Sequence, residues 1–271
     1  MKKFKLVTAT AALLLLASHM LTACGSSADA GQSKLDQIKA SGQLVLGTSA
    51  DYPPYEFHVI ENGQDTIVGF DIAIAQAVAD HLGVELVVKD MDFSGLLPAL
   101  STGTVDMVIA GMSPTEERKQ NVDFSDIYYQ AEIGVLVKKD VLASYNDLAS
   151  LDGKKIGAQQ GSIQEEAALK VADAEVRSMP KVLDLVQELE NGNIEALIVE
   201  KNVGDQLTGK YADLAVAPFS VPVSGSGSAI AIAKGNDEFV AEVNKVIADL
   251  LAKDQVSQFY VEADTLFSNQ D

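Results

Sequence analysis

Residues 96–111, LLPALSTGTVDMVIAG, decide the fold, because their pattern returns at residues 185–200 as LVQELENGNIEALIVE. Both segments read as a helix, a glycine that ends the helix, and a strand. They align without gaps, pairing Leu96 with Leu185, Leu100 with Leu189, Gly103 with Gly192, and Ile109 with Ile198. Any helix–glycine–strand unit has this form, but residues 154–162, KKIGAQQGS, also open the second half as residues 44–51, LVLGTSAD, open the first. We therefore expect two similar α/β lobes.

Strands and helices alternate through the first half of the chain. Strands are expected at 43–49, 84–90 and 105–111, and helices at 69–83 and 94–103. Ser94 is expected to cap the second helix, with Pro98 in its first turn, where a missing N–H costs nothing. This order predicts a mostly parallel sheet flanked by helices, and ligands bind beside the carboxyl ends of such strands. Gly111 and Glu200 occupy equivalent positions there.

Two later segments are expected to connect the lobes. Residues 128–139 cross from the first lobe to the second, and residues 220–234 cross back, with Pro and Gly residues that suit a hinge. The final helices carry an apolar stripe that is expected to pack on the first lobe. The stripe consists of Phe239, Val243, Val246, Ile247 and Leu250.

The composition limits the possible partners. A chain of 271 residues with 47% hydrophobic content is long enough for a large core and two domains. Its formal net charge of −19 argues against nucleic acid or an anionic membrane surface as a direct partner. Trp is absent and aromatic residues make up 6% of the chain, which argues against a polysaccharide-binding platform.

The N-terminus has the pattern of an export signal. Three lysines precede an apolar run at residues 6–17, and this run is too short for a transmembrane anchor. The tetrapeptide Leu21-Thr22-Ala23-Cys24 resembles a bacterial lipobox, in which the cysteine is lipidated. We therefore expect a signal peptide at 1–23 and a lipidated Cys24 with a flexible tether at 24–34. Because Cys24 is the only cysteine, the chain has no internal disulfide.

Arg118 lies in the stretch VDMVIAGMSPTEER, just after a predicted strand. Only two of the 20 basic residues are arginine, Arg118 and Arg177. A guanidinium holds a carboxylate with two parallel hydrogen bonds, which lysine does not. One alternative is a solvated side chain paired with Glu116 or Glu117. In a two-lobed protein, however, Arg118 of one lobe and Glu200 of the other would meet across a cleft.

Four stretches together carry a resemblance to a known family: ADYPPYEF, VGFDIAIAQAVADHLG, GMSPTEERKQNVDFSDIYY and NGNIEALIVEKN. Over residues 35–270 the chain resembles bacterial extracytoplasmic solute-binding proteins of the polar amino-acid family (family 3), the receptor components of ABC importers. The resemblance implies the type II periplasmic-binding-protein fold, with two α/β lobes and a two-stranded hinge. Lobe 1 would comprise 35–130 plus 226–271, and lobe 2 would comprise 131–225.

The resemblance also implies a site for a zwitterion. Arg118 and Ser113 would hold the ligand carboxylate, together with a backbone N–H near Ser162 and Ile163. Glu200 and the carbonyl of Gly111 would hold the ammonium. The family more usually has Asp at the position of Glu200 and often a hydroxyl residue at that of Ile163. Thr115, followed by two glutamates, is expected to begin a helix whose N-terminus favours an anion.

The ligand side chain would contact a second group of residues. Tyr52 and Phe93 are expected to be pocket walls, with Gln164 nearby, while Tyr55 is expected to serve packing. Asp51 and Glu56 are expected to be turn and solvent groups. If either of these acids faces the pocket instead, it favours a cationic side chain.

These observations predict a receptor that closes around a polar L-amino acid and delivers it to a membrane permease and its ATPase. A cationic ligand (arginine, lysine or histidine) is favoured, and glutamine is possible. We expect a monomeric, lipid-anchored protein outside the cytoplasm, with no cofactor, no nucleic-acid partner and no catalysis. A metal site is not expected, because His58 and His81 lie on different elements and have no cluster of other metal ligands beside them. One alternative is a periplasmic dehydratase of prephenate-like acids on the same fold, and another is an amino-acid sensor without transport.

Overall fold

The computed structural model describes residues 32–61, 63–223, 225 and 227–270. The predicted signal peptide, Cys24 and the tether up to residue 31 lie outside these residues. None of the helices in the described part of the chain combines the length and apolarity that a membrane span requires.

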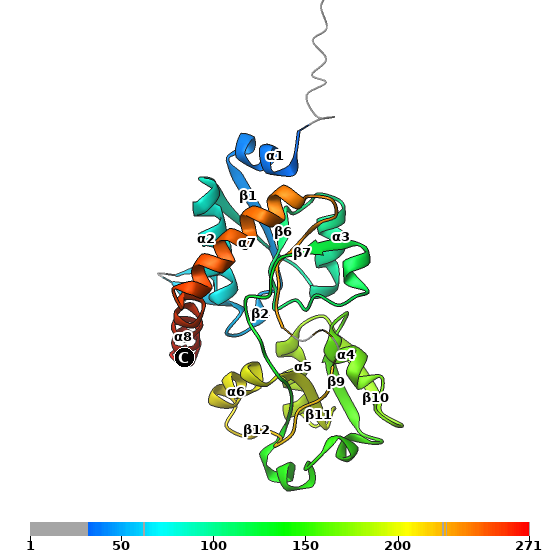
Figure 1. The fold of residues 1–271 in the computed structure, drawn as a ribbon. Coiled ribbons are helices and arrows are strands. Elements are labelled where there is room, and N and C mark those ends of the chain that lie inside the picture. The colour runs from blue at the N-terminus through cyan, green and yellow to red at the C-terminus, as the bar shows by residue number, and fades with distance from the viewer. Residues whose placement is uncertain (1–31, 62, 224, 226, 271) are drawn as a thin grey trace, which may run out of the picture. The chain divides into compact units, whose positions relative to one another are not determined.

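Two five-stranded sheets organise the described chain (Figure 1). We call the part around the first sheet lobe 1 and the part around the second lobe 2. In spatial order, lobe 1 has β5 (Glu85–Asp90), β1 (Gln43–Thr48), β6 (Met107–Val108), β13 (Ala231–Ala233) and β7 (Val122–Phe124). Lobe 2 has β10 (Glu175–Met179), β9 (Lys155–Gln159), β11 (Ala196–Glu200), β8 (Ile133–Lys138) and β12 (Leu214–Val216). A smaller antiparallel sheet joins β2 (Asp51–Tyr52), β3 (Glu56–Glu61) and β4 (Gln64–Val68).

The two large sheets have the same pattern of strand directions. In each, three neighbouring strands are parallel and the fourth runs against both of its neighbours. The reversed strand is β13 in lobe 1 and β8 in lobe 2. Each of these is the first strand after the chain arrives from the other lobe, so its direction follows from the crossing. The expectation of mostly parallel sheets is confirmed.

The internal repeat is confirmed by the strand registers. Leu46 of β1 lies opposite Met107 of β6, and Ile156 of β9 lies opposite Ala196 of β11. Met107 and Ala196 are paired by the ungapped alignment of residues 96–111 with 185–200.

A glycine in each lobe makes room for the residue that leads from the repeated helix into the repeated strand. A Cβ on Gly47 would lie 3.2 Å from Val105, and a Cβ on Gly157 would lie 2.5 Å from the Ile194 side chain. Val105 and Ile194 are themselves equivalent in the repeat. The same small residue therefore makes room for the same contact twice.

Helices cover both sheets (Figure 1). Lobe 1 carries α1 (Lys34–Ser41), α2 (Phe70–Leu82), α3 (Leu96–Ser101), α7 (Asp237–Ala252) and α8 (Gln255–Ser268). Lobe 2 carries α4 (Ile163–Ala168), α5 (Val182–Glu190) and α6 (Lys201–Lys210). Short 3-10 turns lie at Phe93–Gly95, Arg118–Gln120, Lys139–Ser144 and Leu148–Leu151. The predicted stripe on α7 is buried at all five positions, and α7 packs on α1 and α2.

Two local expectations are wrong. Ser94 does not cap α3: it lies inside the 3-10 turn Phe93–Gly95, and α3 begins after Gly95 without a side-chain cap. The segment after Thr115 forms a 3-10 turn, Arg118–Gln120, instead of a helix, because the chain enters β7 two residues later. The Thr115 hydroxyl does accept the Arg118 N–H at 3.2 Å, as a capping residue would.

The two crossing segments pair with each other. Tyr128 donates its backbone N–H to the carbonyl of Ser228 at 3.0 Å, and Ser228 donates to the carbonyl of Tyr129 at 2.8 Å. This short antiparallel ribbon lies where the sequence predicts the hinge.

The C-terminal helix α8 contacts both lobes. It packs on α2 of lobe 1, as expected for the final helices, and it also contacts α6 of lobe 2. Gln206 of α6 donates to Asp264 of α8, and Ser268 of α8 donates to Gln206 at 3.4 Å. Lys210 of α6 lies 5.5 Å from the centre of the Phe267 ring.

Candidate ligand-binding site

A small cavity of about 10 Å³ lies between residues of the two lobes. Lobe 1 contributes Tyr52, Phe93, Ala110, Gly111, Ser113 and Arg118, and lobe 2 contributes Gln159, Ser162, Ile163 and Gln164. Most of these residues were expected at the site from the sequence; Ala110 and Gln159 were not. Glu200, Asp51 and Glu56 are not among the lining residues.

Arg118 directs its guanidinium into this cavity. One terminal nitrogen donates to the Ser113 carbonyl at 2.9 Å, and the other donates to the Gly161 carbonyl of lobe 2 at 3.0 Å. The guanidinium carbon lies 5.5 Å from the centre of the Phe93 ring. Burial lowers the pKa of Arg118 from its ordinary value. Among the described residues, no carboxylate forms an ion pair with Arg118, so the solvated pairing with a glutamate is not what the structure shows.

Glu200 ends β11 and is buried, with 2% of its surface exposed. Its carboxylate accepts a hydrogen bond from the Tyr55 hydroxyl, and its backbone N–H donates to the Tyr52 hydroxyl at 3.1 Å. Burial raises the pKa of Glu200 to about 8, against the lowering effect of the Tyr55 hydrogen bond. Glu200 thus contacts the lining residue Tyr52 without lining the cavity itself.

Tyr52 and Tyr55 both contact Glu200, and Tyr52 also lines the cavity. Their rings stack at 5.6 Å, and the Tyr52 hydroxyl accepts a hydrogen bond from Gln164 of lobe 2 at 3.3 Å. Tyr55 packs on Phe70 at 4.4 Å, as expected, but it also holds Glu200. No sequence signal separates this role of the hydroxyl from simple packing, because phenylalanine would pack equally well.

Asp51 and Glu56 are buried, with 5% and 1% of their surfaces exposed, so their expected role as turn and solvent groups is wrong. Burial raises the pKa of Asp51 to about 6. Burial, followed by the nearby Asp71, raises the pKa of Glu56 well above its ordinary range. The segment DYPPYEF explains the error: its two ends form β2 and the start of β3, which takes both acids away from water.

Asp71 is a site residue that the sequence analysis missed. Its carboxylate accepts the Gly111 N–H at 2.9 Å and the Tyr128 hydroxyl at 2.8 Å, so it ties the cavity lining to the crossing segment. Burial raises the pKa of Asp71 to about 7. Gly111 has a φ of 54°, which favours glycine. An available signal was an acidic residue on the apolar face of the predicted helix.

The loop of lobe 2 that precedes α4 contributes Ser162 to the cavity lining. Ser162 caps α4: its hydroxyl accepts the Glu165 N–H at 3.1 Å and donates to the Gln159 carbonyl at 2.7 Å. The Ser162 N–H also donates to the Gln159 carbonyl, at 3.2 Å, so neither polar group of Ser162 is free for the ligand carboxylate that it was expected to bind.

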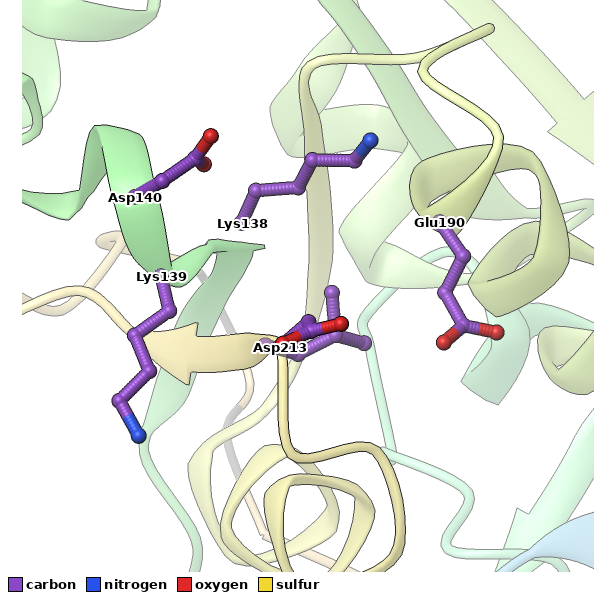
Figure 2. Close-up of a pocket in the computed structure, with 6 residues that line it drawn as sticks. Lys138, Lys139, Asp140, Glu190 and Asp213 are labelled. Atoms are coloured by element: carbon purple, nitrogen blue, oxygen red, sulfur yellow. The ribbon is translucent and has the colours of Figure 1, made fainter.

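Another pocket, of about 330 Å³, lies at the edge of lobe 2, where β8 ends and β12 begins (Figure 2). It is lined by Lys138, Lys139, Asp140, Glu190, Asp213 and Leu214. Figure 2 shows the Lys138 and Lys139 side chains pointing in opposite directions, so their charges do not converge on a common ligand. In the described residues, no cluster of His, Cys, Asp or Glu side chains has the arrangement of a metal site.

The chain belongs to the bacterial extracellular solute-binding proteins, family 3, whose family model matches residues 44–262. It is similar to the arginine-binding extracellular protein ArtP of Bacillus subtilis, with 38% identity over 256 residues, 92% of this chain and 93% of that protein. It is also similar to a probable histidine-binding protein of Campylobacter jejuni, with 31% identity, 90% of this chain and 91% of that protein.

Among solved structures, the chain resembles an amino acid ABC transporter substrate-binding protein from Streptococcus pneumoniae bound to L-arginine. The TM-score is 0.84 and the identity 37%, over 86% of this chain and 98% of that one. The fold class expected from the sequence is confirmed by this likeness.

Proposed function

We propose that this protein is the substrate-binding receptor of an ABC amino-acid importer and that it captures a cationic L-amino acid, arginine in the first place. The observation that carries the proposal is a cluster of buried acids beside the cavity. Four buried carboxyl groups surround Tyr52 and Tyr55, whereas Arg118 is the only cation of the cavity lining. The four are Asp51, Glu56, Asp71 and Glu200. A ligand with one carboxylate and two cationic groups fits this arrangement better than a ligand with a neutral side chain, because a nearby cation favours the charged form of a buried acid.

In this proposal, Arg118 and the loop near Ile163 bind the ligand carboxylate. Glu200 and the Gly111 carbonyl bind the ammonium, with Tyr55 holding Glu200 in place. Tyr52 and Phe93 cover the side chain, with Gln164 at the cavity wall. Ser113 supports Arg118 through its carbonyl, at 2.9 Å. Ligand binding completes contacts between the lobes and shifts the population toward the closed form.

The named relatives support this choice of ligand, since one is called arginine-binding, another histidine-binding, and a solved structure holds L-arginine. A thermal-shift screen of the twenty amino acids tests it, because a ligand well above its Kd raises the Tm by mass action. The largest shift should come from arginine, with smaller shifts from lysine and histidine. A larger shift with glutamine, or none with any amino acid, would reject the cationic ligand.

The remaining expectations are part of the same proposal. The protein acts as a monomer without catalysis, and Cys24 carries a lipid anchor that holds it at the outer face of the cell membrane beside a permease and an ATPase. Mass spectrometry of the membrane fraction tests the anchor, because a diacylglyceryl group on Cys24 adds a defined mass. Incubation with a prephenate-like acid tests the dehydratase alternative; an unchanged acid is the expected result.

A further inference from the structure

The two lobes also meet outside the cavity, where β2 of lobe 1 reaches the start of α5 in lobe 2. Asp51 accepts the backbone N–H of Val182 with one carboxylate oxygen and the Ser49 hydroxyl, at 3.1 Å, with the other. Both oxygens are thus engaged, and Asp51 does not line the cavity.

The first turn of α5 has no cap from its own lobe. Lys181 occupies the capping position and makes no side-chain hydrogen bond there. Free N–H groups at a helix start need an acceptor, which Asp51 of the opposite lobe supplies. Lys181 points back across the same contact, 3.4 Å from Asp90 of β5. Asp90 in turn accepts the Ala50 N–H, at 2.8 Å. We call Asp51, Asp90, Lys181 and Val182 the interlobe cap.

The position of α5 connects this contact to closure. The helix runs back from β10 to β11, so its N-terminus lies at the carboxyl edge of the sheet, the edge at which Glu200 ends β11. If the lobes parted, Val182 would lose the acceptor from lobe 1 and Asp51 would be exposed to water.

We infer that Asp51 determines affinity by capping α5 from the opposite lobe in the closed form, without touching the ligand. This inference rests on the proposed function, in that ligand affinity is taken to depend on closure. The apparent Kd falls as the closed fraction rises, so a contact made only on closure strengthens the binding of every ligand by one factor. A helix cap of ordinary strength corresponds to a factor of about two to thirty.

The test compares Asp51→Ala with Asp51→Asn in the full chain, using arginine and glutamine as ligands. Stopped-flow fluorescence and titration calorimetry give the rates and the Kd. We expect Asp51→Ala to raise the dissociation rate about two- to thirtyfold, with little change in the association rate and the same factor for both ligands. Asp51→Asn retains an oxygen that can accept the Val182 N–H and should lie near the parent.

Two outcomes would overturn the inference. One is an unchanged dissociation rate in Asp51→Ala. The other is a loss confined to arginine, which would mean that Asp51 contacts the ligand side chain. Asp249→Ala, on an exposed residue of α7 that pairs with Lys253 at 2.7 Å, is the matched control and should change neither rate.

A measurement without ligand separates this inference from the proposed function. Small-angle X-ray scattering of the ligand-free protein should show a larger radius of gyration for Asp51→Ala, and for Lys181→Ala as a second variant that leaves Asp51 in place. If neither amino acid binds the parent, the proposed function fails while the scattering still decides the interlobe cap. Equal radii in all three proteins would count against the cap.

Discussion

Arg118 donates to carbonyl groups of both lobes and keeps further N–H groups for an anion. Arg118→Ala should weaken amino-acid binding by about 3–5 kcal/mol, the range for removing one partner of a buried charge pair. Arg118→Lys should also weaken it, because an ammonium does not reproduce the planar fork. Titration calorimetry measures both. Arg177→Lys, on the exposed arginine that pairs with Glu188 at 2.8 Å, is the control and should bind normally; normal binding by Arg118→Ala would refute the assignment.

The burial of Glu200 predicts proton release on binding. With a pKa of about 8, its carboxyl group is mostly protonated at pH 7 in the ligand-free protein. An ammonium beside it favours the charged form and lowers the pKa. Binding at pH 7 should therefore release up to about one proton and become tighter from pH 6 to pH 8. Calorimetry in phosphate and in Tris measures the release, since the observed heat then depends on the buffer.

Glu200→Gln is the control for this release. It should bind more weakly, and its heat should depend less on the buffer. The same heat in both buffers for the parent protein would show that Glu200 does not change charge on binding.

Among single residues, the sequence predicted the site residues whose amino-acid type is unusual for their position in the chain. Arg118 stood out because arginine is rare in the chain, and Gly111 because it ends a predicted strand. Asp71, Tyr55 and the burial of Glu56 were missed for one physical reason: each depends on what packs against it. The chain between Asp51 and Asp71 folds back on itself, so that Phe70 and Asp71 donate N–H groups to the carbonyls of Pro54 and Tyr55.

Among the elements, the start of α2 is sensitive to a single methyl group. Gly69 has a φ of 136°, and a Cβ there would overlap the Tyr55 carbonyl. Gly69→Ala should destabilise the protein by at least about 3 kcal/mol. The alanine would adopt a strained backbone conformation, and the backbone at Tyr55 would also have to move. Ligand affinity should fall too, since Tyr55 holds Glu200. Urea unfolding measures the free energy of unfolding.

Gly83, at the other end of α2, provides the comparison. It has a φ of 71° with open space around its missing side chain. Gly83→Ala should lower the free energy of unfolding by only about 1–2 kcal/mol, because alanine is that much less stable than glycine in a left-handed conformation. Equal losses in the two variants would show that the contact with Tyr55 is unimportant.

Long amphipathic helices and strands of the parallel core were predictable because their periodicity reflects burial on one side. Short turns were not. Thr115 and two glutamates form a good helix start, yet only a 3-10 turn fits before β7 begins at Val122. Ser94 likewise has the chemistry of a cap but lies one turn too early. Competition between neighbouring elements for the same residues decides such cases.

For the whole molecule, the buried acids predict how stability depends on pH. The pKa values of Asp51, Asp71 and Glu200 rise to about 6, 7 and 8, above their ordinary values near 4. Between about pH 4 and 8 the folded chain therefore holds more protons than the unfolded chain, and the free energy of unfolding falls as pH rises. Thermal unfolding of the ligand-free protein should give a lower Tm at pH 8 than at pH 5.

Bound arginine should make this slope shallower, because its cations stabilise the charged acids. Glu200→Gln should do the same without ligand. A Tm that rises from pH 5 to pH 8 would contradict the raised pKa values.

The two-lobed arrangement was predictable because the two halves of the sequence share a repeated pattern, which includes Gly47 in one half and Gly157 in the other. The contacts between the lobes were not. The α8 contact with α6, Asp51 at the start of α5 and Arg118 on the Gly161 carbonyl each join residues far apart in the chain. No local pattern encodes such pairings.

The ribbon in which Tyr128 and Tyr129 pair with Ser228 restricts how the lobes can move. A single connecting strand would allow rotation about its own axis, whereas two strands tied by hydrogen bonds resist torsion and leave bending as the soft coordinate. Relative motion is then close to one degree of freedom. Ligands of different length would be accommodated by closing the lobes to different bending angles. A fold of this kind can therefore change its specificity through a few residues of the cavity wall, while the closing motion stays the same.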